Sequence, residues 1–269
     1  QQWHTLFSGI LPEDRILESE PMSRHTTFGI GGPADCLLLP DDAEELRSVL
    51  HITSEAGCQV FIIGGGANLL VRDGGIRGVV VSTQRLKQIY RRGNEIVSQT
   101  GNSTSSVARF ACREGLSGME FACGIPGSIG GAVYMNAGAY NGEISGIVAS
   151  AVVCSRRGEM RKCDASDIDY AYRHSLFMSS GDAIVEVTLR LISGDTSEIQ
   201  NRMDEFMLRR QTRQPLEYRS AGSTFKRPEG HFVGEMIENL GLKGFSVGDA
   251  QVSEKHAGFL INRGHATCA

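Results

Sequence analysis

The stretch Gly124-Ile-Pro-Gly-Ser-Ile-Gly-Gly-Ala-Val-Tyr-Met-Asn-Ala-Gly-Ala-Tyr140 decides how this chain of 269 residues is interpreted. It holds five glycines and one proline, and it contains no Lys, Arg, Asp or Glu. Because glycine loses more conformational freedom on folding than other residues, such a density needs a reason. A tight turn packed on the core is one reason, and main-chain N–H groups gathered around a phosphorylated ligand are another. We favour the ligand, because the uncharged run is too long for one turn.

A second glycine-rich run, Gly64-Gly65-Gly66-Ala67-Asn68, directly follows an apolar strand predicted over residues 60–63. Before it, a short strand over 36–39 precedes a helix that Asp41 or Asp42 caps and Gly57 ends. This order predicts a small parallel βαβ unit, and such units bind phosphates at the carboxyl end of a strand. Neither a Rossmann nor a Walker pattern is present, because no G-x-G-x-x-G opens a helix and no Gly-Lys-Ser/Thr follows.

Hydrophobic periodicity predicts the other elements. They are strands over 79–81, 147–154, 183–192, 250–252 and 258–261, and helices over 103–114, 195–213 and 233–240. The 183–192 segment alternates in polarity, which predicts a half-buried antiparallel strand. The last helix carries an apolar stripe at i, i+3, i+4 and i+7, and Gly241 is expected to end it. Residues 1–24 are interpreted as a lead-in segment, and a domain boundary is predicted near Ser193.

Composition excludes several classes of protein. A hydrophobic content of 41% and a charged content of 22% fit a soluble globular protein. The net charge of −4 argues against non-specific binding of nucleic acid. We expect no membrane span and no signal peptide, because no apolar run has the required length or flanks. The seven cysteines are odd in number and lack a Cys-x-x-Cys pair, so we expect reduced thiols in a cytoplasm and no metal site.

Three further segments carry candidate binding residues. His25 opens a glycine-rich loop, and we interpret it as structural because nothing acidic stands beside it in the sequence. Arg209, Arg210 and Arg213 end a helix, where cations suit the helix dipole and an anionic substrate equally well. Small residues around Ser223 would let a ligand approach, and two cations follow them.

Taken together, the motifs resemble one known family in their order along the chain. These motifs are Gly64–Leu70, Gly124–Tyr140, Tyr172–Phe177, Ala221–Lys226 and Glu254–Asn262. The chain resembles the UDP-N-acetylenolpyruvoylglucosamine reductases, also called UDP-N-acetylmuramate dehydrogenases, from about His25 onward. The resemblance implies an α+β protein with an FAD-binding fold of the vanillyl-alcohol oxidase and p-cresol methylhydroxylase type. That fold would comprise two flavin subdomains, residues 25–82 and 83–194, and an α+β substrate-binding domain, residues 195–269.

The resemblance also implies non-covalent FAD, with NADPH as co-substrate. The first glycine-rich run would wrap the pyrophosphate, and the second would lie along it and the flavin. The implied cofactor-binding residues are Ile63, Gly64, Gly65, Gly66, Ala67, Asn68, Gly124, Pro126, Gly127, Ser128, Gly130, Gly131 and Asn136.

In the implied reaction, NADPH reduces the flavin, and the flavin passes a hydride to C3 of an enolpyruvyl ether of UDP-N-acetylglucosamine. Arg173 matches the catalytic arginine that holds the developing negative charge, and Ser223 matches the proton donor. We expect Lys226 to help activate the serine. The expected substrate-binding residues are Tyr172, Arg210, Arg213, Lys226, Arg227 and His256.

Two departures from the family pattern stand out. The family carries a catalytic Glu in a C-terminal helix and strand, but the sequence ends at Ala269 and no residue matches that Glu. Either the sequence is a truncated or partly ordered product, or this variant of the enzyme works by a different mechanism. We favour truncation. No Tyr occurs between Phe177 and Arg213, which is typical of the subtype without a tyrosine loop.

We expect a monomeric bacterial cytoplasmic enzyme with small-molecule partners only. The alternatives are another flavin oxidase of the same fold and a flavin-binding protein without catalysis.

Overall fold

A computed structural model describes residues 2–269 and divides them into two compact units. The first unit comprises residues 2–19, 35–65 and 77–207, and the second comprises residues 20–34, 66–76 and 208–269. This partition by compactness differs from the predicted subdomain boundaries, which stay a prediction. None of the helices in residues 2–269 is both long enough and apolar enough to cross a membrane.

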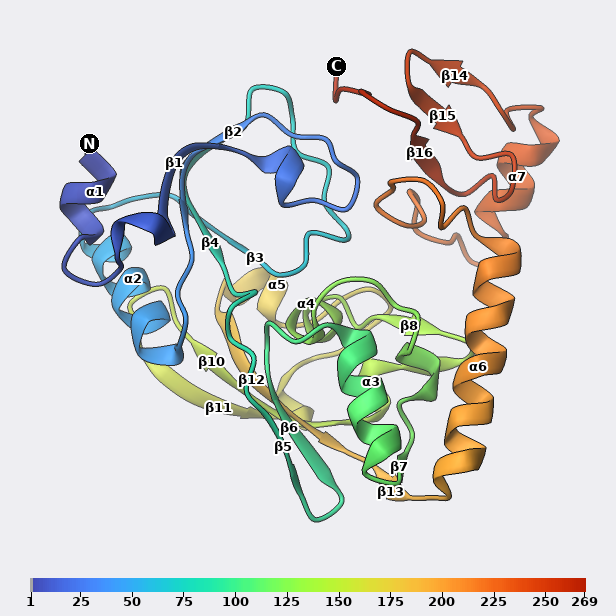
Figure 1. The fold of residues 1–269 in the computed structure, drawn as a ribbon, viewed down its shortest axis with the longest axis horizontal. Coiled ribbons are helices and arrows are strands. Elements are labelled where there is room, and N and C mark those ends of the chain that lie inside the picture. The colour runs from blue at the N-terminus through green and yellow to red at the C-terminus, as the bar shows by residue number, and fades with distance from the viewer. Residues whose placement is uncertain (1) are drawn as a thin grey trace. The chain divides into compact units, whose positions relative to one another are not determined.

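The N-terminal part of the chain contributes a four-stranded sheet in the order β1-β2-β4-β3 (Figure 1). Its strands are β1 (Ile16–Pro21), β2 (Pro33–Leu38), β3 (Val60–Ile63) and β4 (Ile76–Ser82). Helix α2 (Ala43–Glu55) joins β2 to β3, and the Asp42 carboxylate accepts the Glu45 N–H at 2.9 Å. The predicted strand–helix–strand order is therefore present, but β4 lies between β2 and β3 and is the parallel neighbour of β3.

A five-stranded sheet in the first unit runs in the order β11-β10-β12-β6-β5. Its strands are β5 (Ile89–Arg92), β6 (Glu95–Gln99), β10 (Val148–Cys154), β11 (Met160–Asp164) and β12 (Ala183–Arg190). The prediction that β12 is half-buried is wrong, because Thr188 and Ile184 on its other face are only 8% and 6% exposed. Strand β12 is central, with antiparallel neighbours on both edges as predicted, and its side chains are buried because they contribute to both apolar clusters of the first unit.

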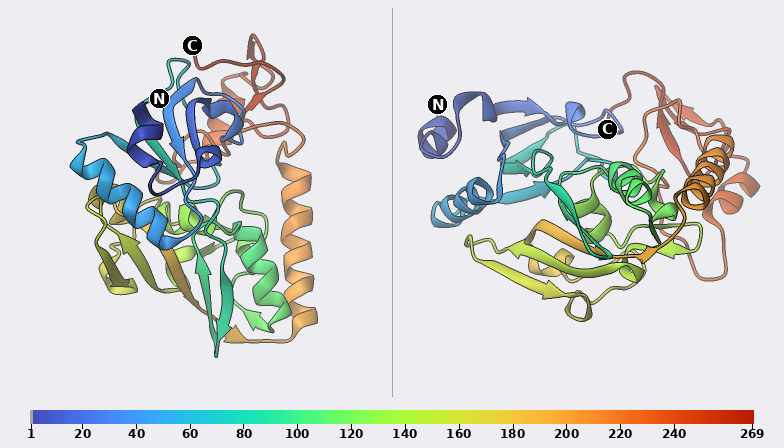
Figure 2. Two further views of the ribbon diagram at one scale, coloured as in Figure 1. Left: turned by 60° about the vertical axis from the view of Figure 1, so that its left-hand side comes forward. Right: turned by 60° about the horizontal axis from the view of Figure 1, so that its bottom comes forward.

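Helices complete the core of the first unit (Figure 2). They are α1 (Gln2–Phe7), α3 (Thr104–Arg113), α4 (Ile129–Tyr134) and α5 (Phe177–Ser180), and α6 (Thr196–Arg213) begins here. Ser103 and Ser128 cap α3 and α4 by accepting N–H groups of the first turn, as their residue type favours. The larger apolar core packs α3, α4 and α5 with β10 and β12 around the fully buried Phe177. Short two-residue strands β7 (Leu116–Ser117), β8 (Gly138–Ala139), β9 (Gly142–Glu143) and β13 (Ile192–Ser193) form two small ladders.

The second unit contains helix α7 (Val233–Asn239) and a sheet of β14 (Ser246–Val247), β15 (Ala250–Val252) and β16 (Leu260–Asn262). The predicted helix is present, and its apolar stripe is not buried within the described residues, because Met236 is 47% exposed and Leu240 71% exposed. Gly241, with φ 70°, follows the end of the helix as predicted.

Candidate functional site

The two glycine-rich runs meet within the first unit. A Cβ atom added to Gly65 would lie 2.7 Å from Gly127 Cα, and one added to Gly64 would overlap Ser128 Oγ. Side chains at these positions would push the two backbones apart, so the glycines are explained by a close approach. The sequence predicted both runs as parts of one site, and the structure brings their first-unit residues together.

The main-chain N–H groups at this meeting point have no hydrogen-bond acceptor among the residues that the structure describes. Among residues 2–269, the amides of Gly64, Gly65, Gly127 and Ser128 donate no hydrogen bond. The carbonyl oxygens are engaged, because Gln84 Nε2 donates to Gly64 O at 3.0 Å and the Thr104 N–H donates to Gly127 O at 3.0 Å. Unpaired N–H groups on two closely packed backbone runs supply the donors that a nest for phosphate oxygens needs.

Other predicted cofactor residues have a packing role of their own. Gly130 donates its N–H to Thr100 O at 3.1 Å, and a Cβ at Gly130 would occupy the place of the Thr100 hydroxyl. Gly131 donates to Ser128 Oγ at 3.2 Å. Pro126 is exposed, Gly124 is half-buried, and Ile63 ends β3. Contact of these residues with a cofactor stays a prediction.

The rest of the first run, Gly66 to Asn68, belongs to the second unit. Gly66 adopts φ 62°, and a Cβ there would overlap the His25 carbonyl oxygen, so glycine is required. Its own carbonyl accepts the Thr27 N–H at 3.1 Å. The amides of Gly66, Ala67 and Asn68 have no acceptor within the described chain, as in the first-unit part of the run.

His25 does have an acidic neighbour, contrary to the reason given for its structural role. Glu20 Oε1 lies 2.9 Å from His25 Nε2, and both side chains are mostly buried. The two residues are five positions apart, and the turn between β1 and the glycine-rich loop brings them together. A local scan for adjacent charges could not find this pair.

Asn136 anchors the end of the second glycine-rich stretch. It is 2% exposed and adopts φ 44°, a conformation that asparagine tolerates better than most residues. Its Nδ2 donates to Glu143 Oε2 at 3.2 Å and to Ala171 O at 3.0 Å, and its Oδ1 accepts the Ser145 N–H at 3.0 Å. Asn136 therefore joins three loops of the first unit and fixes the backbone beside Arg173.

Arg173 lies against this backbone. Its Nη1 donates to Asn136 O at 3.1 Å and its Nη2 to Gly138 O at 3.2 Å, and its Cζ lies 5.0 Å from the centre of the Tyr172 ring. In residues 2–269 no carboxylate forms an ion pair with it. Its φ of 53° is strained for arginine, and such strain clusters at functional positions. A positioned guanidinium with donors to spare suits a substrate carboxylate.

Ser223 belongs to the second unit, where its segment joins the edge of the small sheet. Ser223 bridges to Phe259, and the Thr224 N–H donates to Gly258 O at 2.9 Å. Gly222 turns the chain with φ 80°, and the Ser223 side chain is exposed. The structure records no hydrogen bond between Ser223 and Lys226 within this unit, so activation of the serine by Lys226 stays a prediction.

The remaining predicted substrate residues also lie in the second unit, apart from Tyr172. His256 Nδ1 accepts the Gly258 N–H at 3.1 Å, and burial lowers the pKa of His256, so the neutral ring carries its proton on Nε2. Arg227 stacks on Phe232 with Cζ 3.8 Å from the ring centre, and Lys226 is exposed. Arg210 and Arg213 occupy the last turn of α6, where the helix dipole favours cations.

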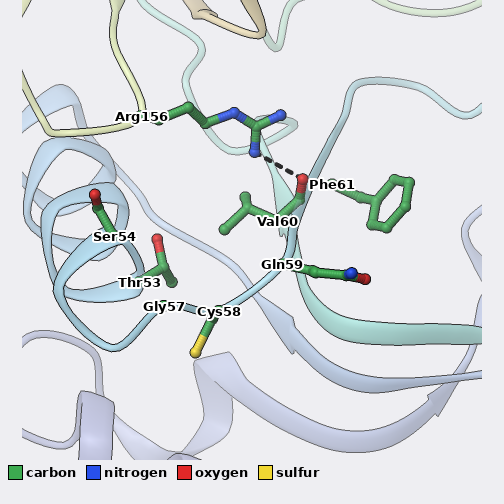
Figure 3. Close-up of a pocket in the computed structure, with 8 residues that line it drawn as sticks. All are labelled: Thr53, Ser54, Gly57, Cys58, Gln59, Val60, Phe61 and Arg156. Carbon is green, nitrogen blue, oxygen red and sulfur yellow. Dashed lines mark hydrogen bonds between the residues drawn. The ribbon is translucent and has the colours of Figure 1, made fainter.

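The first unit also contains a hollow (Figure 3). It has a volume of about 570 Å³. Two of its lining residues bond to each other, because Arg156 Nη1 donates to Val60 O at 2.7 Å. Its lining residues are Thr53, Ser54, Gly57, Cys58, Gln59, Val60, Phe61 and Arg156. None of the residues predicted to bind cofactor or substrate lines it.

Several residues of the site carried no signal in the sequence. Gln84 holds the Gly64 carbonyl across 20 positions, and Thr100 packs on Gly130 across 30 positions. Glu143, seven residues after Asn136, accepts its amide. These roles depend on tertiary contacts and have no local pattern.

Comparison with known proteins agrees with this geometry. Residues 34–164 match the FAD binding domain family, and residues 214–269 match the C-terminal domain of UDP-N-acetylenolpyruvoylglucosamine reductase. The chain is 49% identical over 258 residues to the UDP-N-acetylenolpyruvoylglucosamine reductase of Clostridium novyi, covering 96% of this chain and 84% of that protein. It is 49% identical to the reductase of Clostridium kluyveri, covering 96% and 85%.

Solved structures give the same result. The reductase of Thermus caldophilus superposes with a TM-score of 0.82 at 32% identity, covering 93% of this chain and 88% of that one. An alkyldihydroxyacetonephosphate synthase, with a TM-score of 0.54 at 14% identity over 71% of this chain and 40% of that one, shares the fold only.

The fold and the amide cradle define an FAD-binding oxidoreductase of the vanillyl-alcohol oxidase type. Within that class, the chain belongs to the UDP-N-acetylenolpyruvoylglucosamine reductase family. The residues present fit the cofactor, because unpaired N–H groups on both glycine-rich runs supply donors for a pyrophosphate and the closely packed glycines leave no side chain in its way. The predicted family, fold, enzyme class and cofactor are thereby confirmed.

Proposed function

We propose that the chain reduces UDP-N-acetylglucosamine enolpyruvate to UDP-N-acetylmuramate with NADPH, a step of peptidoglycan precursor synthesis. The observation that carries the proposal is the cradle of unpaired amides at Gly64, Gly65, Gly127 and Ser128 in a chain of this family. When bound there, FAD would accept a hydride from NADPH and deliver one to the substrate. The protein's own residues must then hold the substrate, stabilise charge and supply a proton.

Arg173 is proposed to hold the substrate carboxylate. Addition of a hydride at C3 places negative charge at C2, and that charge spreads into the carboxylate. A guanidinium already fixed by the carbonyls of Asn136 and Gly138 can stabilise the charge without reorganising. Because no carboxylate of residues 2–269 pairs with Arg173, the substrate would not have to displace an internal partner.

Ser223 is proposed to give its hydroxyl proton to C2. The sheet edge holds its backbone through the bridge to Phe259, while its side chain stays exposed and accessible. A serine hydroxyl is a weak acid, so the proton transfer depends on nearby positive charge. Lys226 and Arg227 follow it in the sequence and are the proposed sources of that charge.

The sugar nucleotide is proposed to contact cationic and aromatic residues of the family motifs. These are Tyr172, Arg210, Arg213, Lys226, Arg227 and His256. The net charge of −4 and the small-molecule chemistry suit a cytoplasmic bacterial enzyme that works as a monomer.

The test mixes purified protein, FAD, NADPH and the enolpyruvyl sugar nucleotide, and it follows NADPH absorbance. We expect NADPH consumption that requires the sugar nucleotide and yields UDP-N-acetylmuramate. Consumption that requires oxygen instead, with flavin that stays attached after denaturation, would indicate an oxidase. Flavin binding without NADPH consumption would indicate a flavin-binding protein without catalysis.

A further inference from the structure

Thr27 contacts two functional segments of the second unit at once. Its N–H donates to Gly66 O at 3.1 Å, and its Oγ1 donates to Ser220 O at 2.7 Å. Gly66 belongs to the run proposed to bind the cofactor pyrophosphate, and Ser220 lies three residues before Ser223. One residue therefore joins the cofactor loop to the segment that carries the proposed proton donor.

Two neighbouring contacts hold the same segments together. The Arg219 side chain lies directly on Gly29, where an added Cβ would be 2.7 Å from Arg219 Nη1. Asn262 is 4% exposed, and its Nδ2 donates to Phe28 O at 3.0 Å while its N–H donates to Arg219 O at 2.8 Å. Residues 27–29 are thus fastened to the start of the Ser223 segment by three independent contacts.

The segment itself has little other support in its middle. It is held at its ends, by Asn262 at Arg219 and by Phe259 at Ser223. Between them Gly222 turns with φ 80°, and no atom lies within 4 Å of the position where its Cβ would be. Of the three contacts, the Thr27 hydroxyl bond is the one whose residue also bonds directly to the cofactor loop, through its N–H to Gly66 O, so it can influence where Ser223 lies.

We propose that Thr27 is a positioning residue that couples cofactor binding at Gly66–Asn68 to the placement of Ser223. A phosphate bound to the amides of the loop would order Gly66, and its carbonyl would in turn hold Thr27 and, through the hydroxyl, Ser220. Coupling of this kind is reciprocal. Loosening the segment that carries Ser223 should therefore also weaken the ordering of Gly66–Asn68 by a bound phosphate. This inference rests on the proposed function, because it takes the cofactor site and the proton donor from it.

The experiment measures hydrogen–deuterium exchange in a peptide covering residues 219–224, with and without FAD. In the wild type we expect FAD to slow exchange of this peptide. Thr27→Val keeps the shape of the side chain but removes the donor, and we expect it to speed exchange roughly 2- to 10-fold with FAD bound, as loss of one neutral hydrogen bond predicts. Thr27→Ser keeps the hydroxyl and should restore wild-type protection.

Thr212→Val is the matched control. Thr212 Oγ1 makes the same type of exposed bond, to Leu208 O at 2.8 Å within α6, without touching the serine segment. We expect this variant to keep the FAD-linked protection of residues 219–224. A second readout is the split between half-reactions: Thr27→Val should slow flavin reoxidation by the sugar nucleotide and leave flavin reduction by NADPH unchanged.

Three outcomes would overturn the inference. If Thr27→Val binds FAD and FAD slows exchange of its residues 219–224 as much as in the wild type, this inference is overturned and the proposed function is not. Failure of Thr27→Ser to rescue would show that packing, and not the hydroxyl bond, is what matters. A wild type that does not bind FAD would overturn the proposed function, and the inference would fall with it.

Discussion

Replacing Gly65 by Ala is the sharpest test of the amide cradle. Gly65 does not adopt a positive φ, so its backbone tolerates alanine, and only the space beside it opposes the change. The new Cβ would lie 2.7 Å from Gly127 Cα and 3.0 Å from Ser128 N, and all of these neighbours are backbone atoms. Ordinary contact begins at 3.4 Å, so the two runs must separate by about 0.7 Å, the difference between 3.4 and 2.7 Å.

Overpacking of this size costs about 1–3 kcal/mol. If the shift falls on the amide cradle, the same free energy is lost from FAD binding, which corresponds to a rise in Kd of roughly 5- to 150-fold. Separation of the runs moves the Gly127 and Ser128 amides away from those of Gly64 and Gly65, so the loss should appear in cofactor affinity and not only in stability.

The assay titrates apoprotein with FAD and follows the change in flavin fluorescence. Gly146→Ala is the control, because Gly146 has no atom within 4 Å of its Cβ position and no positive φ. We expect the control to bind FAD as the wild type does. Wild-type affinity in Gly65→Ala, with the protein folded, would refute the argument that the close approach of the two runs builds the cofactor site.

Three further predictions follow from single residues. Arg173→Gln should lower kcat/KM for the enolpyruvyl sugar nucleotide by roughly 10- to 150-fold, because a hydrogen bond to a charged group is lost, and the rate of flavin reduction by NADPH should not change; equal effects on both would contradict the role. Asp42→Ala should lower the free energy of unfolding by about 1 kcal/mol in urea denaturation, because the Glu45 N–H loses its cap. Burial lowers the folded-state pKa of His256 below its usual 6.5, so stability should fall as pH drops through about 6.5, where the unfolded state takes up the proton first. In His256→Asn, the urea midpoint should depend less on pH across this range. An unchanged dependence of the midpoint on pH would contradict the argument from burial.

Local chemistry explains which elements the sequence predicts well. The residues that begin and end α2 act on their own neighbours in the sequence. Asp42 caps the first turn, and Gly57 follows the last turn with a positive φ, as predicted. Strand β3 agrees with its predicted range because an uninterrupted apolar run ends at a glycine. In these places each residue's own preference agrees with its tertiary surroundings.

Tertiary contacts explain what the sequence did not predict. Helix α4 contains two consecutive glycines, which disfavour a helix, and it forms because Ser128 caps it and the core covers it. Strand β1 looked like a lead-in segment, and its neighbour β2 gives it a place in the sheet. The apolar stripe of α7 has helical periodicity, but none of the helix residues is buried among residues 2–269.

The candidate site was predicted in two different ways. Glycine density alone indicated the cradle, and the unpaired amides support that interpretation. Arg173 and Ser223 came from the resemblance to the family, since nothing in their local pattern separates them from a surface arginine and a turn serine. Asn136 and Thr27, the residues that contact their segments, make bonds between parts of the chain that are distant in the sequence, and these contacts needed the structure.

The central claim is that a cofactor-binding cradle and a separate proton donor serve two successive half-reactions. Anaerobic stopped-flow absorbance of FAD-loaded Ser223→Ala tests it most directly. We expect NADPH to bleach the flavin band at the wild-type rate, while recovery of the band on adding the enolpyruvyl sugar nucleotide is lost. Equal slowing of both phases, or recovery at the wild-type rate, would contradict the account.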